Sequence, residues 1–74
     1  MRFRPKALII EDERAIRRLV RVALENAGYR MFEAEAGETG LRMAAERRMD
    51  VILLDLGLPD MSGMAWLRTF REWS

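Results

Sequence analysis

The sequence predicts an α/β fold in which helices cover a parallel sheet. Short apolar runs at residues 7–10 and 51–54 have the continuous hydrophobicity of strands that are buried on both faces. Between and after these runs, apolar residues recur at the three- to four-residue spacing of amphipathic helices. Strands that alternate with helices along a chain pair in parallel, so we expect the order strand, helix, strand, helix, strand, helix.

The first strand is expected at residues 6–11 and the first helix at residues 13–27. Asp12 is expected to cap the start of this helix, and Gly28 stands where a helix-ending glycine belongs. The apolar face of the helix repeats at intervals of three and four residues and should face the sheet. Its members are Ile16, Leu19, Val20, Ala23, Leu24 and Ala27.

The remaining elements follow in the same alternation. Residues 29–35 predict a weaker, outer strand, and residues 37–48 predict a helix. Residues 50–55 form the clearest strand, 56–62 a loop, and 63–73 a third helix. The side chains expected to face inward from the second and third helices are Leu41, Ala44, Ala45, Met64, Leu67 and Phe70.

The composition excludes several classes of site. The 74 residues contain no Cys and no His, which removes disulfides, thiolate or imidazole metal ligands, and a phospho-histidine. Thirteen basic residues balance twelve acidic ones, so the net charge of +1 gives no reason to expect a nucleic-acid partner. No apolar run approaches the roughly 18 residues that span a bilayer, and we expect a soluble cytoplasmic protein without a membrane partner.

A basic stripe marks the first helix. Arg14, Arg17, Arg18 and Arg21 recur at helical spacing and could contact nucleic-acid phosphates. Because the net charge is near zero and no recognition motif is present, we favour a solvated face whose arginines pair with Glu13 or Glu25.

Three carboxylates stand at strand ends. Glu11 and Asp12 end the first strand, and Asp55 ends the third. If these strands are neighbours, the acids converge at the carboxyl edge of the sheet, where open α/β sheets bind ligands. Two such charges about 4 Å apart repel by around 4 kcal/mol at an effective dielectric near 20, so the cluster should bind a proton or a cation. An all-oxygen site indicates Mg²⁺, to which the Gly57 carbonyl could add a ligand.

Each acid alone also has a structural explanation. Asp12 is most simply a helix cap, and Glu11 a first-turn acid favoured by the helix dipole. Asp55 is harder to explain in this way, because it does not directly precede a helix and Pro59, Asp60 and Ser62 already supply the turn and cap residues. The combination of all three favours a site.

Two enzyme classes fit less well. A Mg²⁺ phosphohydrolase of the aspartyl-phosphate type would place a second acid two residues after Asp55, where Gly57 stands. A nucleotide-binding fold would place a loop rich in Gly, Ser or Thr after the first strand, where the sequence reads EDERAI. These two enzyme interpretations are therefore disfavoured, and we do not expect an enzyme.

The motifs ALIIEDE and VILLDLGLPDMSG, at their separation here, resemble the receiver domain of bacterial two-component response regulators. The resemblance covers essentially the whole chain and implies a flavodoxin-like parallel sheet with strand order 2-1-3. It implies that Asp55 accepts a phosphoryl group from the phospho-histidine of a sensor histidine kinase. It also implies a Mg²⁺ site in which Asp12 and Asp55 are direct ligands, Glu11 acts through water, and the Gly57 carbonyl is the third protein ligand.

The family's receiver has five strands and five helices, so we interpret residues 1–74 as a truncated receiver domain, its N-terminal half. The hydroxyl and the lysine that the family places at the fourth and fifth strands have no counterpart here, since Lys6 starts the first strand. The third strand would then be an exposed apolar edge, through which we expect a homo-oligomer. Two hypotheses remain: a phospho-accepting module impaired by truncation, and a self-associating fragment that does not switch.

Overall fold

The computed structural model describes residues 3–73 and contains the six elements expected from the sequence. Their bounds are β1 Lys6–Ile10, α1 Arg14–Asn26, β2 Arg30–Ala34, α2 Gly37–Glu46, β3 Val51–Leu54 and α3 Gly63–Trp73. The prediction for α3 matches at both ends, and the other elements are shorter than expected by one or two residues.

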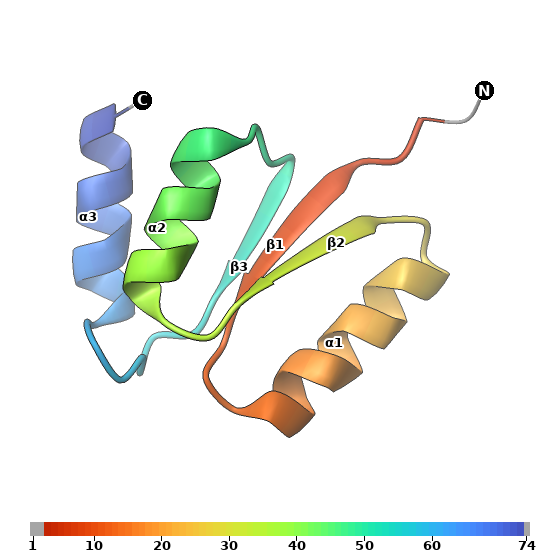
Figure 1. The fold of residues 1–74 in the computed structure, drawn as a ribbon, viewed down its shortest axis with the longest axis horizontal. Coiled ribbons are helices and arrows are strands. Elements are labelled where there is room, and N and C mark those ends of the chain that lie inside the picture. Colours follow the sequence, from red (N-terminus) through yellow and green to blue (C-terminus); the bar gives the residue numbers. More distant parts are fainter. Residues whose placement is uncertain (1–2, 74) are drawn as a thin grey trace.

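The three strands form one parallel sheet in the order β2-β1-β3 (Figure 1). In this register Leu8 of β1 lies between Phe32 of β2 and Ile52 of β3. The predicted α/β class and the strand order 2-1-3 are therefore confirmed. Because β1 is central, its residues from Ala7 to Ile10 are buried, whereas Leu53 of the outer strand β3 is 38% exposed.

Helices lie on both sides of the sheet, with α2 and α3 on one side and α1 on the other (Figure 1). The main core fills the space between the sheet and α2 and α3. Its buried members are Leu8, Ile10, Ala34, Leu58 and Trp66. Phe32, Leu41, Ala44, Ile52 and Phe70 pack against this group.

Trp66 anchors α3 to this core. Its side chain is 1% exposed, its Nε1 donates a hydrogen bond of 3.0 Å to the Gly37 carbonyl, and its ring stacks on Phe70. The expected inward position of Met64 is wrong, since Met64 is 62% exposed. The face of α3 that meets the core is therefore turned from the predicted one toward Trp66.

The prediction for the inward face of α1 is wrong in part, since Val20 and Leu24 are half-buried but other members of that face are exposed. Leu19 is 70% exposed and Ile16 is 44% exposed, whereas Arg17 is buried. The reason lies in the strand that α1 crosses: β2 places Glu33 beside α1, and basic side chains of the helix meet it. The apolar Ile16 instead lines a shallow groove with Leu53 of β3.

The two ends of α1 differ in how well the sequence predicted them. Gly28 follows the helix with a φ of 99°, and the N–H groups of Gly28 and Tyr29 close the last turn on the carbonyls of Glu25 and Leu24. The predicted cap at Asp12 is wrong, because Glu13 occupies the N-cap position and makes no side-chain cap hydrogen bond.

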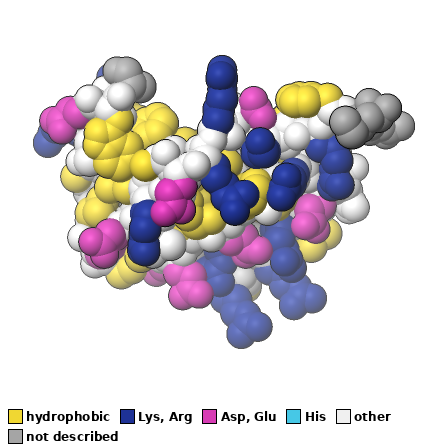
Figure 2. Space-filling view, turned by 45° about the horizontal axis from the view of Figure 1, so that its top comes forward, with side chains coloured by type: hydrophobic (Ala, Val, Ile, Leu, Met, Phe, Trp, Pro, Cys, Tyr) yellow, Lys and Arg dark blue, Asp and Glu magenta, His cyan; other side chains and the backbone are white. Residues whose placement is uncertain are grey.

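Figure 2 shows basic and acidic side chains interspersed over the face in view, with apolar side chains between them. No helix within residues 3–73 is long and apolar enough to cross a membrane.

Candidate functional site

The acidic residues predicted to converge do meet at the carboxyl edge of the sheet. Ile10 and Leu54 are register partners at the ends of β1 and β3, so the residues that follow them leave the sheet side by side. The Asp55 N–H extends this pairing with a 3.0 Å hydrogen bond to the Ile10 carbonyl. One carboxylate oxygen each from Glu11, Asp12 and Asp55 lies within 4.8 Å of the others.

The local backbone orients two of the three carboxylates. Glu11 Oε2 accepts a hydrogen bond of 3.0 Å from the Glu13 N–H, and Asp55 Oδ1 accepts one of 3.1 Å from the Gly57 N–H. Within residues 3–73 the exposed Asp12 carboxylate makes no hydrogen bond or ion pair. Each acid thus keeps at least one oxygen available for a ligand.

The loop after β3 folds back on itself at Gly63. The Gly63 N–H donates to the Leu56 carbonyl at 2.9 Å, and a Cβ at Gly63 would lie 2.8 Å from the Leu56 Cα. Ser62 accepts the Ala65 N–H through Oγ and so caps α3, as its sequence position suggests. Gly57 has an ordinary negative φ and open space where a Cβ would stand, so the close bend depends on Gly63.

Asp60 ties this loop to the start of α2. Its two carboxylate oxygens accept the N–H groups of Gly37 and Glu38 at 2.8 and 2.9 Å. The Glu38 N–H, followed by the Gly37 N–H, lowers the pKa of Asp60 below its usual value of 3.8. Sequence reasoning assigned Asp60 to the local turn and missed this role, because its partners lie more than twenty positions away in the chain.

The residues present fit a divalent cation that prefers oxygen ligands. Three carboxylates within 4.8 Å of one another repel. A cation bound between them would be attracted to each carboxylate and would offset this repulsion. With no His or Cys in the chain, the donor set matches Mg²⁺ better than a softer transition metal. Lys6 begins β1 at the opposite end of the sheet, where its N–H donates to Asp50, so it stands away from the cluster as expected.

Residues 7–74 match the family described as the response regulator receiver domain. The chain belongs to this family. Receiver domains of response regulators are signalling modules.

Individual relatives agree with this assignment. The chain is 57% identical over 67 residues to the KDP operon transcriptional regulatory protein KdpE of Escherichia coli K12, covering 90% of this chain and 30% of that protein. A narrower resemblance, to the potassium-transport operon regulator, is carried by two segments, IIEDERAIRRLVRVALE and LLDLGLPDMSGMAWLRTFREWS. The identity to KdpE confirms this resemblance. The chain thus spans about a third of the length of this relative.

Solved structures match the fold closely. The response regulator TrrA of Thermotoga maritima, in complex with Mg²⁺ and BeF, superposes with a TM-score of 0.91 at 30% identity, covering 95% of this chain and 61% of that one. A complex of the histidine kinase ThkA with TrrA matches with a TM-score of 0.89 at 30% identity, covering 95% and 60%. The acidic cluster therefore lies on a sheet that has the receiver fold.

Proposed function

We propose that this receiver chain is a phospho-accepting signalling module in which Asp55 takes up the phosphoryl group. The observation that carries the proposal is the convergence of Glu11, Asp12 and Asp55 within 4.8 Å at the carboxyl edge of the sheet. Asp55 follows β3, whereas Glu11 and Asp12 follow the neighbouring strand β1. The Gly57 N–H already orients the Asp55 carboxylate.

The same residues would hold Mg²⁺. Asp12 and Asp55 are the proposed direct ligands, Glu11 the proposed ligand through water, and the Gly57 carbonyl the third protein ligand. When bound, the cation supplies positive charge that offsets the charge on the phosphoryl oxygens. The match to TrrA, whose structure is a complex with Mg²⁺ and BeF, supports this assignment.

The reaction asks little of the protein beyond position and charge. An Asp55 carboxylate oxygen attacks phosphorus in line with the departing group, forming a P–O bond as the bond between phosphorus and the donor breaks. The hydrogen bond from the Gly57 N–H to Oδ1 limits the rotation of the carboxylate during the attack. The product is a mixed anhydride at the edge of the sheet.

The proposed phosphodonor is the phospho-histidine of a sensor histidine kinase. This follows from the family and from the likeness to TrrA, which has been seen in complex with the histidine kinase ThkA. Residues 3–73 place no lysine at the acidic cluster, so we expect slower phosphorylation than in a receiver that has one. The name of KdpE states that it regulates transcription. We propose the same output for a longer protein that contains this chain.

The direct test is the intact mass of the chain after incubation with Mg²⁺ and acetyl phosphate. A phosphoryl adduct on the wild type that is absent from Asp55→Asn and from samples with a metal chelator is the expected result. A folded wild-type chain that gains no adduct would remove the phospho-acceptor function from this chain. An adduct that persists in Asp55→Asn would place the acceptor elsewhere.

A second candidate function is self-association without switching. In the part of the chain that the structure describes, β3 pairs only with β1, which leaves its other edge open and Leu53 38% exposed. An open apolar edge can pair with a second copy of the chain. Sedimentation with and without Mg²⁺ and acetyl phosphate distinguishes the two candidates, because this one predicts an oligomer that ignores both reagents.

A further inference from the structure

Arg17 is a cation that α1 turns toward the sheet. Its side chain is 11% exposed, although apolar residues on the same helix are more exposed, Ile16 at 44% and Leu19 at 70%. Burying a guanidinium costs free energy unless its charge and its N–H groups are met by partners. The partners that meet Arg17 therefore indicate what the side chain does.

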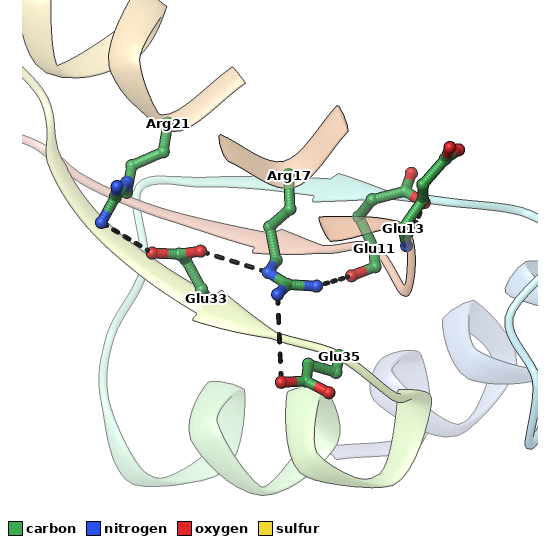
Figure 3. A network of polar contacts seen from close by, with 6 residues as sticks. All are labelled: Glu11, Glu13, Arg17, Arg21, Glu33 and Glu35. Carbon is green, nitrogen blue, oxygen red and sulfur yellow. Dashed lines mark hydrogen bonds and ion pairs between the residues drawn. The ribbon is translucent and has the colours of Figure 1, made fainter. Parts of the chain in front are cut away.

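Figure 3 shows the Arg17 guanidinium reaching from α1 to the ends of β1 and β2. Nε donates to Glu33 Oε1 at 3.2 Å, and Nη1 donates to the backbone carbonyl of Glu11 at 2.8 Å. Nη2 lies 3.9 Å from Glu35, whose side chain is 80% exposed, so this third contact should contribute little. The two short contacts join β2 to the peptide that leads into the acidic cluster.

The Glu11 carbonyl belongs to the peptide bond between Glu11 and Asp12. The preceding peptide, between Ile10 and Glu11, is fixed as well, because the Glu11 N–H donates to the Ala34 carbonyl at 3.0 Å. Beyond Glu11 the chain leaves the sheet, and the Asp12 carboxylate has no hydrogen bond of its own within residues 3–73. Arg17 therefore holds the peptide plane that sets the direction in which Asp12 leaves β1.

Glu33 holds the guanidinium in place for this contact. It accepts Arg17 through Oε1 and Arg21 Nη1 through Oε2 at 3.3 Å (Figure 3). Glu33 pairs with Ile9 in the sheet register, so its backbone is held against the central strand. The chain of contacts thus runs from β2 through Glu33 and Arg17 to the peptide before Asp12.

We propose that Arg17 is a positioning residue for the acidic site: by holding the Glu11 carbonyl it keeps the Asp12 carboxylate aimed at Asp55. This inference rests on the proposed Mg²⁺ site, and it assigns part of the site's geometry to a helix that contributes no ligand. The matched control is Arg21, which shares Glu33 with Arg17 but, within the described residues, makes no hydrogen bond or ion pair with Glu11 (Figure 3).

The test is the Mg²⁺ dissociation constant of the whole chain, measured by isothermal titration calorimetry, together with the urea midpoint of unfolding. Removing groups that orient metal ligands typically weakens metal binding 10- to 100-fold, and for Arg17→Met we expect about tenfold because only the backbone of a ligand is touched. Arg21→Met should lower the urea midpoint and leave the Mg²⁺ affinity unchanged. A purely structural Arg17 would lower the midpoint in the same way, also with unchanged affinity.

Arg17→Lys keeps the charge beside Glu33 but offers no planar fork to reach Glu11 at the same time, so it should fold and still bind Mg²⁺ more weakly. A wild-type affinity in the folded Arg17→Lys or Arg17→Met chain overturns the positioning role while leaving the proposed function intact. A wild-type chain that binds Mg²⁺ no better than Asp55→Asn overturns the proposed function, and the role of Arg17 with it.

Discussion

Replacing Asp12 by Asn should make the metal-free chain more stable. The Asp12 carboxylate oxygen lies within 4.8 Å of oxygens of both Glu11 and Asp55. At that separation each pair of charges repels by about 0.9 kcal/mol in bulk water and about 3.5 kcal/mol at an effective dielectric of 20. Because Asp12 is exposed, the lower figure is the relevant one.

Salt reduces this repulsion further. With a screening length of about 8 Å at physiological ionic strength, the two repulsions together come to about 1 kcal/mol. For a domain of this size that corresponds to about 4–8 °C in Tm. Asp12 also lies near the start of α1, where a negative charge is favoured by the helix dipole, and the substitution loses that contribution.

Glu13→Gln is the matched control, because Glu13 is the N-cap of α1 and lies outside the acidic cluster. It loses a helix-dipole interaction without relieving the repulsion at the site. In thermal unfolding followed by circular dichroism with a chelator present, Asp12→Asn should be more stable than Glu13→Gln by about 1 kcal/mol.

Mg²⁺ should reverse the order of stability. At ten times its dissociation constant a ligand stabilises the folded state by about 1.4 kcal/mol, and the wild type and Glu13→Gln should gain this while Asp12→Asn gains little. If Asp12→Asn is no more stable than Glu13→Gln without metal, and both respond equally to Mg²⁺, the three carboxylates do not act as one site.

Three further predictions concern the scaffold. Gly40→Ala should lower the free energy of unfolding by about 1 kcal/mol, because a Cβ there would lie 2.6 Å from Ile10 Cδ1 and the overpacking costs more than the gain in helix propensity. Adding Ile10→Val to the same chain should recover part of the loss. A Gly40→Ala chain that is more stable than wild type would contradict the packing argument. Asp60→Asn should destabilise the chain at pH 7, and the difference from wild type should shrink as the pH falls below 3.8. The reason is that the pKa of Asp60 is lower in the folded chain than in the unfolded chain, so its contribution to stability is lost as the pH falls through the folded-state pKa. Urea unfolding at pH 7 and pH 3 checks this, and an equal difference at both pH values would refute it. Trp66→Phe should cost about 2 kcal/mol by removing a buried hydrogen bond and ring volume, whereas Trp73→Phe, at a half-exposed position, should cost far less by the same assay.

The candidate site was largely predictable because its members sit at strand ends. Glu11 and Asp12 directly follow one apolar run and Asp55 follows another. Parallel pairing of neighbouring strands is then enough to bring all three to one edge, as the register of β1 and β3 shows. The supporting contacts were not predictable, because Asp60 and Arg17 reach partners that no local spacing relates to them.

The sequence by itself determined the element order, the α/β class and the position of the acids, because hydrophobic period and strand ends are local properties of the chain. Only the tertiary structure decided which face of α1 turns inward. Val20 and Leu24 of the apolar stripe are half-buried, whereas Arg17 of the basic stripe is buried. Arg17 is buried because β2 places Glu33 beside the helix and the chain after β1 places the Glu11 carbonyl within reach. Burial of a charge depends on partners brought from elsewhere in the chain, and those partners exist only once the strands have paired.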